Sequence, residues 1–453
     1  MACKVSLQSL LATLIAISVA NNGNGSAQVA GRCIAYVRPA TRIPSALLHV
    51  VPMPAWEQRK ASEVFQIVDD RGHPTLPVLS ATQNQGMIYR DDSGRYIGHD
   101  ESNEIGYKRV LPGDFVVHLR SFQGGFAHSQ YEGITSPAYT VFRAKEPTSH
   151  SDRFWKHWFM SEHFIAGLST VTYGIRDGRS ISVDEFMNTF LAFPAVEEQA
   201  AISRLFDYLD DLITLHQRKY DKLVIFKKSM LEKMFPKDGE SVPEIRFAGF
   251  TDPWEQRKFG DCFEFLKSNT LSRAGLNGEN GTARNVHYGD ILIKFGDCLD
   301  GERSDLPFIT DDTVLPKYAG SILREGDVIF ADTAEDETAG KCVELRKLPK
   351  EPTISGLHTI PARPRFPFGT GYLGHYLNSD AYHRQLLPLM QGIKVISVSK
   401  AALQDTQVRF PGLSEQSAIG AALNEIDSLI TLHQRKLELL QNIKKSLLDK
   451  MFV

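Results

Sequence analysis

The sequence predicts an α+β protein in which two mixed α/β domains are joined by two long helices, packed as an antiparallel coiled coil within an internal pseudo-two-fold repeat. Two observations carry this prediction. Residues 212–219 read Leu-Ile-Thr-Leu-His-Gln-Arg-Lys, and residues 429–436 repeat the same letters. Residues 56–60, Trp-Glu-Gln-Arg-Lys, return at 254–258. An internal repeat of this size decides the architecture before any single element does.

The blocks between the repeated segments have diverged in length and in sequence. The Trp-Glu-Gln-Arg-Lys copies begin at positions 56 and 254, and the helix copies begin at positions 212 and 429. The interval between the helix copies is the longer of the two, so the second block is longer than the first. A kept framework around divergent blocks is typical of a scaffold that holds two recognition domains of different specificity.

The first 52 residues have no counterpart in the second half. Lys4 precedes a mostly apolar run, Val5 to Ala20, which is typical of a signal peptide. The second half instead reaches its Trp-Glu-Gln-Arg-Lys through Glu244 to Pro253. We interpret the N-terminal segment as an atypical extension or a frameshifted start. The predicted divisions are 1–52 for this extension, 53–193 for the first domain, 194–250 for the first helix and its linker, 251–410 for the second domain, and 411–453 for the second helix.

The first block combines short strands with a helical, aromatic stretch, and the second block shows the same order. In each block a Gly-Asp pair, Gly113-Asp114 or Gly326-Asp327, precedes a strand. The predicted strands are 77–80, 114–119, 138–142, 290–295 and 327–331, and the predicted helices are 154–168 and 372–390.

The repeated segments read as long helices. Between Val196 and Phe235, apolar residues recur every three or four positions, and Pro236 ends the pattern. About forty residues make a rod of roughly 60 Å, and two rods with matching apolar stripes favour a coiled coil. His216 and His433 fall on the stripes. They could bind a metal ion as a pair, but a polar pair that sets the register is the favoured interpretation.

Bulk composition excludes little. The chain has 453 residues, which suits two or three domains, and a formal net charge of −3, so no global basic charge announces a nucleic-acid partner. Five cysteines lack Cys-x-x-Cys pairing, which argues against a zinc ribbon or a disulfide framework and indicates a reducing cytoplasm.

No catalytic motif or metal cluster is evident. Gly369, Gly371 and Gly374 satisfy Gly-x-Gly-x-x-Gly, but prolines precede them where a buried strand is required. Pairing Tyr376 with Phe159 at the helix spacing places Asp152, Phe154 and His157 opposite the three glycines. A phosphate-binding loop would hardly be missing from one copy, so we interpret the glycines as the start of a helix.

The repeated elements resemble the specificity subunits of type I restriction–modification systems. The resemblance covers residues 53 to 453 and rests on the paired Trp-Glu-Gln-Arg-Lys segments, the Glu-Gln-x-x-Ile helix starts and the duplicated Leu-Ile-Thr-Leu-His-Gln-Arg-Lys. In the first block, residues 113–125 and 133–139 are similar to that family's target-recognition domains. The second block departs from this pattern after its Gly-Asp.

The resemblance implies a non-catalytic, cytoplasmic subunit. Each target-recognition domain would recognise one half of a bipartite site in double-stranded DNA, and the helices would set the spacing between the halves. Two modification (methyltransferase) subunits would dock on the helices, and restriction (motor-nuclease) subunits would complete the complex. The chain itself would bind no cofactor and no membrane, because S-adenosylmethionine, ATP and Mg²⁺ belong to the partner subunits.

Candidate base-reading side chains are polar or basic residues expected on loops at strand ends. A tight turn and surface ion pairs are the competing explanation for them. The first-domain candidates are Arg120, Ser121, Gln123, Tyr89, Arg90 and Lys108, and the second-domain candidates are Lys294, Thr333 and Lys394. Candidates for partner docking on the helices are Leu212, Ile213, His216, Arg218, Lys219, Leu429, Ile430, His433, Arg435 and Lys436.

Two other classes of protein remain as alternatives. A coiled-coil adaptor with two protein-binding domains would explain the helices but not the divergence of otherwise matched blocks. A nuclease or methyltransferase with a degenerate motif would need the same loss in both copies.

Overall fold

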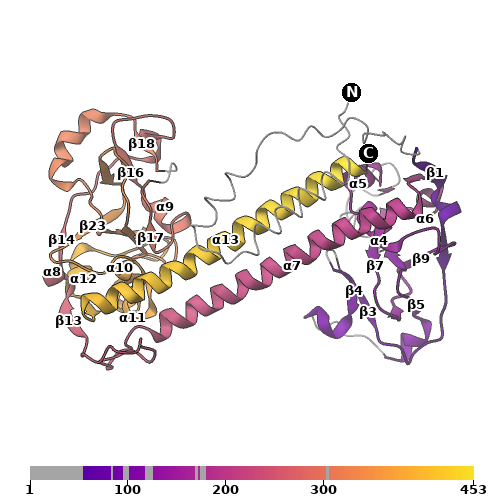
Figure 1. The fold of residues 1–453 in the computed structure, drawn as a ribbon, viewed down its shortest axis with the longest axis horizontal. Coiled ribbons are helices and arrows are strands. Elements are labelled where there is room, and N and C mark those ends of the chain that lie inside the picture. The colour runs from indigo at the N-terminus through magenta and orange to yellow at the C-terminus, as the bar shows by residue number, and fades with distance from the viewer. Residues whose placement is uncertain are drawn as a thin grey trace, which may run out of the picture. The chain divides into compact units, whose positions relative to one another are not determined.

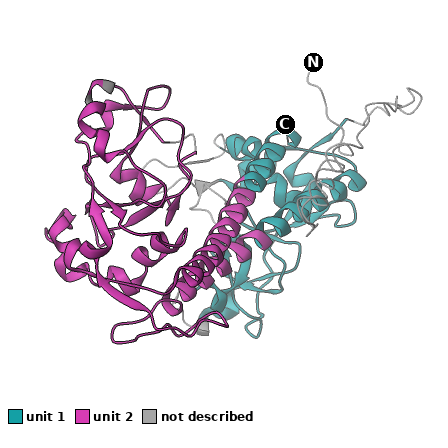
Figure 2. Cartoon of the chain, turned by 60° about the vertical axis from the view of Figure 1, so that its left-hand side comes forward, with its two compact units in different colours: residues 1–214, 439–453 teal, residues 215–438 magenta. Residues whose placement is uncertain are grey.

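The computed structural model describes residues 55–82, 85–94, 101–117, 126–168, 172–173, 180–302 and 306–452. The chain forms two compact units (Figure 2): unit 1 comprises residues 1–214 and 439–453, and unit 2 comprises residues 215–438. Both units combine helices with sheets (Figure 1). Within the described stretches, no helix is long and apolar enough to cross a membrane. The predicted extension, residues 1–52, lies outside the described residues.

Unit 1 is centred on a four-stranded sheet in the order β2-β9-β6-β7. Helix α4 packs its aromatic side chains against this sheet, with the ring centres of Trp155 and Phe65 5.3 Å apart. The helix starts where it does because the Ser151 side chain accepts a hydrogen bond from the Phe154 amide. The strands are β1 (Glu57–Lys60), β2 (Phe65–Val68), β3 (Leu79–Thr82), β4 (Gly86–Tyr89), β5 (Lys108–Val110), β6 (Phe115–Val117), β7 (Phe126–His128), β8 (Gly133–Thr135), β9 (Thr140–Ala144), β10 (Thr172–Tyr173), β11 (Ser180–Ile181) and β12 (Phe190–Phe193). The helices are α3 (Ala61–Val64), α4 (Asp152–Trp158), α5 (Glu162–Leu168), α6 (Val183–Asn188) and the first part of α7 (Val196–Lys233), and 3-10 segments lie at Arg90–Ser93 and Glu101–Gly106.

Unit 2 contains a five-stranded sheet, β14-β23-β19-β21-β17, and a four-stranded sheet, β15-β18-β16-β22. The strands are β13 (Glu255–Lys258), β14 (Phe263–Phe265), β15 (Leu276–Asn277), β16 (Arg284–Val286), β17 (Cys298–Leu299), β18 (Phe308–Ile309), β19 (Val328–Ala331), β20 (Thr333–Ala334), β21 (Cys342–Leu345), β22 (Thr353–Ser355), β23 (Thr359–Pro364), β24 (Ile396–Ser397) and β25 (Gln407–Phe410). The helices are α8 (Phe259–Cys262), α9 (Tyr288–Ile293), α10 (Tyr372–Asn378), α11 (Asp380–His383), α12 (Lys400–Asp405) and most of α13 (Leu413–Met451), and 3-10 segments lie at Arg273–Gly275, Asp312–Ser321 and Leu387–Leu389.

The two units repeat the same local contacts. The Trp-Glu-Gln-Arg-Lys segments form β1 and β13, each paired antiparallel with the strand that precedes a long helix, β12 or β25. Both Gly-Asp pairs also occupy equivalent turns. Gly113 and Gly326 have positive φ angles of 94° and 84°. The aspartates that follow are 1% exposed, and each accepts two hydrogen bonds from one arginine, Arg143 or Arg363. The predicted equivalence of the Gly-Asp pairs is confirmed.

Both predicted long helices are present, as α7 and α13. Each ends in a Lys-Met-Phe sequence whose phenylalanine enters a hydrophobic core. In unit 1, Phe452 is 1% exposed and its ring contacts those of Trp56 and Phe206. In unit 2, Phe235 is 1% exposed and contacts Trp254 and Tyr372. The end of α13 therefore completes the core that contains Trp56, and the end of α7 completes the core that contains Trp254.

Three predicted elements are wrong in detail. Residues 290–295 are not a strand but the greater part of α9 and its C-terminal end. The short Ile-Leu-Ile run could not distinguish the two structures, and in the helix Ile291 is buried while Ile293 is 85% exposed. The predicted helix 154–168 is two helices, α4 and α5, and the predicted helix 372–390 is α10, α11 and the 3-10 turn at Leu387–Leu389.

The pairing of Tyr376 with Phe159 is wrong by one position. The amide oxygen of Gln199 accepts from the backbone of Ser151, and that of Gln416 accepts from Gly369. The interval from Ser151 to Gly369 is one position longer than the interval from Gln199 to Gln416. Ser151, Arg153 and Lys156 therefore lie opposite the three glycines, and no phosphate-binding loop exists in unit 1 at these described positions.

Candidate nucleic-acid interface

In unit 2, Thr333 and Lys394 come from neighbouring segments. Thr333 lies in β20, where it pairs with Ser397 of β24, and Lys394 lies in the loop that leads into β24. The Thr333 hydroxyl donates to Asp332 Oδ1 at 2.7 Å. The same carboxylate is 3.4 Å from His358 Nδ1. Asp332 thus orients two side chains at this edge of the unit.

Lys294, the third unit 2 candidate, follows α9 and is paired with Asp290. Asp290 is 1% exposed, and its Oδ1 lies 3.0 Å from Lys294 Nζ. The carboxylate also receives both terminal nitrogens of Arg273, at 2.8 and 2.9 Å. Burial would raise the pKa of Asp290, but the hydrogen bonds from Arg273 and Lys294 outweigh it and lower the pKa.

Aromatic rings connect these two carboxylate clusters. The ring of Tyr288 on α9 lies 5.3 Å from that of His358 and 4.7 Å from that of His287. The Asp332 amide donates to the His358 carbonyl. Elements carrying Lys294, Thr333 and Lys394 are therefore linked by direct contacts. Arg273 and His358 were missed by sequence reasoning, and no local motif marks either one.

In unit 1, Tyr89, Arg90 and Lys108 lie on β4, just after it, and on β5. The ring of Tyr89 is 4.7 Å from that of Tyr131. Lys108 Nζ donates to the Tyr139 carbonyl at 2.8 Å. The Arg90 guanidinium lies 6.0 Å from the ring centre of Tyr107, and its buried Nε and Nη1 atoms have no hydrogen-bond partner among the described residues. Arg120, Ser121 and Gln123 lie outside the described residues.

The docking candidates on the helices fall into two groups. Basic side chains are mostly exposed, whereas the apolar residues and both histidines are half-buried. His216 Nδ1 and His433 Nδ1 are 2.8 Å apart, so one ring must donate and the other accept. Burial lowers the pKa of both histidines, and the nearby Lys219 and Lys436 lower it further. Neutral rings are therefore favoured at this contact. The exposed members are Arg218, Lys219 and Arg435, and the half-buried members are Leu212, Ile213, His216, Leu429, Ile430, His433 and Lys436.

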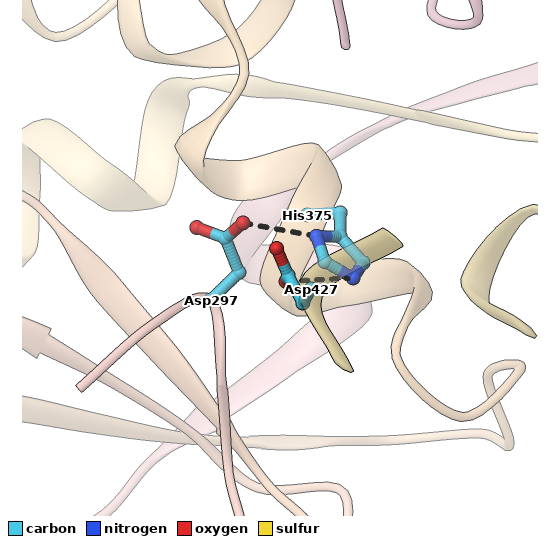
Figure 3. Close-up of side chains that lie close together, drawn as sticks. All are labelled: Asp297, His375 and Asp427. Carbon is cyan, nitrogen blue, oxygen red and sulfur yellow. Dashed lines mark hydrogen bonds and ion pairs between the residues drawn. The ribbon is translucent and has the colours of Figure 1, made fainter. Parts of the chain in front are cut away.

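A second charged cluster, which the sequence did not indicate, lies beside α10 (Figure 3). His375 Nδ1 is 2.9 Å from Asp297 Oδ2, and its Nε2 is 3.9 Å from Asp427 Oδ2. These are metal-ligand types, but the ammonium of Lys227 lies between the two carboxylates, 2.7 Å from Asp297 and 2.5 Å from Asp427. The protein's own cation already bridges the two carboxylates, so the arrangement joins α7, α13 and the unit 2 domain.

The glycine-rich segment, residues 369–374, is hydrogen-bonded to a carboxylate of the same chain. The carboxylate of Glu344, which is 3% exposed, accepts hydrogen bonds from the amides of Gly371 and Gly374 at 2.5 and 2.9 Å. These are the donors that a phosphate-binding loop would offer to an anion. A carboxylate of the chain takes that position, which agrees with interpreting the glycines as a helix start.

No family model matches the chain. Two relatives from Methanocaldococcus jannaschii are similar to it. The type I restriction enzyme MjaVIII specificity subunit is 24% identical over 275 residues, which cover 58% of this chain and 61% of that protein's length. The putative type I restriction enzyme MjaX specificity subunit is 21% identical over 420 residues, covering 87% and 92%. The chain resembles type I specificity subunits.

The likeness to a type I specificity subunit extends to the fold. The solved S subunit of a type I restriction–modification system from M. genitalium has a TM-score of 0.50 with this chain at 11% identity, covering 88% of this chain and 96% of that one. Identity this low concerns the fold alone. Together with the two relatives, it agrees with the resemblance that the repeated sequence segments indicated.

Proposed function

We propose that this chain is the non-catalytic DNA-specificity subunit of a type I restriction–modification complex. The observation that carries the proposal is the two-fold relation between its long helices, α7 and α13. His216 contacts His433, which is its own copy in the second helix. A residue that contacts its own repeat copy lies on the local axis that relates the two helices. Two further pairs obey the same relation, because Lys227 bonds Asp427 and Lys444 bonds Asp210.

Such a scaffold suits two identical partners bound symmetrically. In the proposal, residues 53–193 and 251–410 are target-recognition domains, and residues 194–250 and 411–453 form an antiparallel coiled-coil spacer. Two modification subunits dock on the helices, and restriction subunits join them. S-adenosylmethionine, ATP and Mg²⁺ are bound by those partners, and the complex works in the cytoplasm on double-stranded DNA.

The divergent blocks support two different half-sites. Unit 2 carries the linked side chains around Asp290 and Asp332, whereas unit 1 carries tyrosines around Arg90 and Lys108. Different donors on an equivalent framework are what recognition of two unlike sequences needs. A protein-binding adaptor would not need the framework to match while the blocks that it carries differ.

The test is sequence-specific binding by the assembled complex. The chain is purified with its modification subunits, and its methylated sites are mapped by long-read sequencing in the host. Gel shifts then compare duplexes that carry the mapped bipartite site with duplexes in which one half-site is scrambled. Exchange of residues 56–190 for a homologous block should change one half-site and leave the other intact. Absence of any split-site preference with the partners present would favour the adaptor instead.

A further inference from the structure

Arg273 in unit 2 is exposed yet held in place. Its side chain is 52% exposed, while the carboxylate that it contacts, Asp290, is 1% exposed. Two parallel hydrogen bonds of 2.8 and 2.9 Å fix the plane of the guanidinium. A long side chain that is already immobilised loses little further entropy when it binds a ligand. The buried acid therefore makes Arg273 a preorganised donor.

One edge of the guanidinium is left for a ligand. Asp290 accepts one hydrogen bond from Nη1 and one from Nη2, which together form the terminal edge of the guanidinium. The side edge, Nε with the outer hydrogen of Nη2, has no hydrogen-bond partner among the described residues. Two parallel donors on one edge match the O6 and N7 acceptors of guanine in the major groove. Lys294 pairs with the same carboxylate and is 51% exposed. Its ammonium is a point charge of the kind that contacts phosphate.

Strain in the neighbouring turn independently indicates a functional surface. His358 has φ 53° and is the one non-glycine residue with positive φ in the described part of the chain. Its side chain is 49% exposed and is held by Asp332 and the ring of Tyr288. Strained backbone of this kind clusters at active sites and at segments that bind ligands. Beside Lys294, Ile293 is 85% exposed, which suits contact with a thymine methyl group.

We propose that Arg273, positioned by Asp290, reads a guanine in the half-site recognised by unit 2. The inference rests on the proposed function and adds the residue and the base. Lys294 places the adjacent phosphate, and Ile293 and His358 border the neighbouring base pair. Arg273 is thus a specificity-determining residue, and Asp290 is a positioning residue.

The experiment uses the full chain with its modification subunits and the mapped bipartite duplex. Each guanine of the unit 2 half-site is replaced in turn by 7-deazaguanine, which lacks the N7 acceptor. Wild-type complex should lose roughly 10- to 100-fold in affinity at one guanine. Arg273→Lys and Arg273→Ala should bind the unmodified site more weakly, and Arg273→Ala should no longer respond to that substitution. In the host, their methylated sites should relax at that one position.

Arg384→Ala is the matched control, because Arg384 is a 69% exposed arginine of the same unit that pairs with Asp380. It should keep both affinity and the 7-deazaguanine response. Thermal unfolding shows whether the Arg273 variants are folded, and Arg273→Lys keeps a positive charge on Asp290. A uniform loss of affinity with no relaxed position would make Arg273 a phosphate contact and overturn the proposal, as would unchanged binding. Failure of the wild-type complex to prefer a bipartite site would instead overturn the proposed function.

Discussion

Replacing Lys227 should destabilise unit 2 more than replacing its repeat counterpart, Lys444, destabilises unit 1. Lys227 is 17% exposed at its side chain and contacts two carboxylates, Asp297 (12% exposed) and Asp427 (30% exposed). Burial would lower the pKa of Lys227, but the charges of Asp297 and Asp427 raise it above its usual value. In a Lys227→Met variant the methylene stem is kept and only the ammonium is lost.

The magnitude follows from what the ammonium leaves behind. Removal of one partner from a buried ion pair costs about 3–5 kcal/mol, because the other charge stays desolvated. Asp297 would keep hydrogen bonds from His375 and Asn378 but would face Asp427 with no shared cation. We therefore expect Lys227→Met to lower the free energy of unfolding by about 3 kcal/mol or more. Asp297→Asn in the same chain removes the stranded charge and should restore part of that loss.

The repeat supplies a matched control. Lys444 is 16% exposed and bonds Asp210, which also lies 3.7 Å from Lys156. Lys444→Met therefore leaves Asp210 with another cation, and the expected loss is about 1 kcal/mol. Urea unfolding followed by circular dichroism, with fluorescence of the tryptophans, measures both variants. Equal losses in the two variants, or no recovery when Asp297→Asn is added to Lys227→Met, would refute the reasoning.

Three other outcomes follow from the contacts. Phe452→Ala should destabilise unit 1 by about 3–5 kcal/mol because the ring is fully enclosed, and calorimetry should show Phe235→Ala lowering a different transition. Hydrogen bonding to His375 and the charge of Lys227 overcome the burial of Asp297 and lower its pKa to about 2. Its contribution of about 2 kcal/mol to the free energy of unfolding is therefore present above pH 4 and lost as the pH falls towards 2. Asp297→Asn should accordingly flatten the acid limb of the curve of stability against pH. His216 and His433 have lowered pKa values, so their neutral pairing stabilises the chain above the ordinary histidine pKa and is lost as the pH falls below it. Melting temperatures at pH 7.5 and 5.5 should differ less in a His216→Leu, His433→Leu double variant than in wild type, and an equal difference would contradict this.

The sequence predicted the framework because framework contacts are made twice by the same residue types. Gln199 and Gln416 each donate to the carbonyl of the proline that precedes its helix. Asp114 and Asp327 each bind an arginine on the neighbouring strand. Such contacts need identical side chains in both halves, so they appear as repeated letters. Periodicity then located both long helices close to their observed ends.

The candidate surface could not be predicted in the same way. Arg273 and Asp290 lie on separate elements, as do Asp332 and His358, and neither pair has a counterpart among the described residues of the first half. Only the folded chain shows that one buried acid orients two exposed donors. Because residues 290–295 were predicted as a strand, Asp290 and Lys294 were not expected to lie one helical turn apart on the same face.

The junction between helix and variable block shows how one framework accepts different domains. Asp210 and Asp427 are equivalent, but their surroundings differ at one position of the preceding domain helix, α4 in unit 1 and α10 in unit 2. Unit 1 has Lys156 there, a second cation for Asp210. Unit 2 has Gly374, where a Cβ atom would lie 2.2 Å from the Asp297 carbonyl oxygen, so the glycine admits the backbone that carries a second carboxylate. Because Gly374 and Asp297 belong to the same block, any functional exchange of domains must carry both. A block transferred with a lysine at 374 and Asp297 in place would force the Asp297 backbone out of position and separate its carboxylate from Lys227.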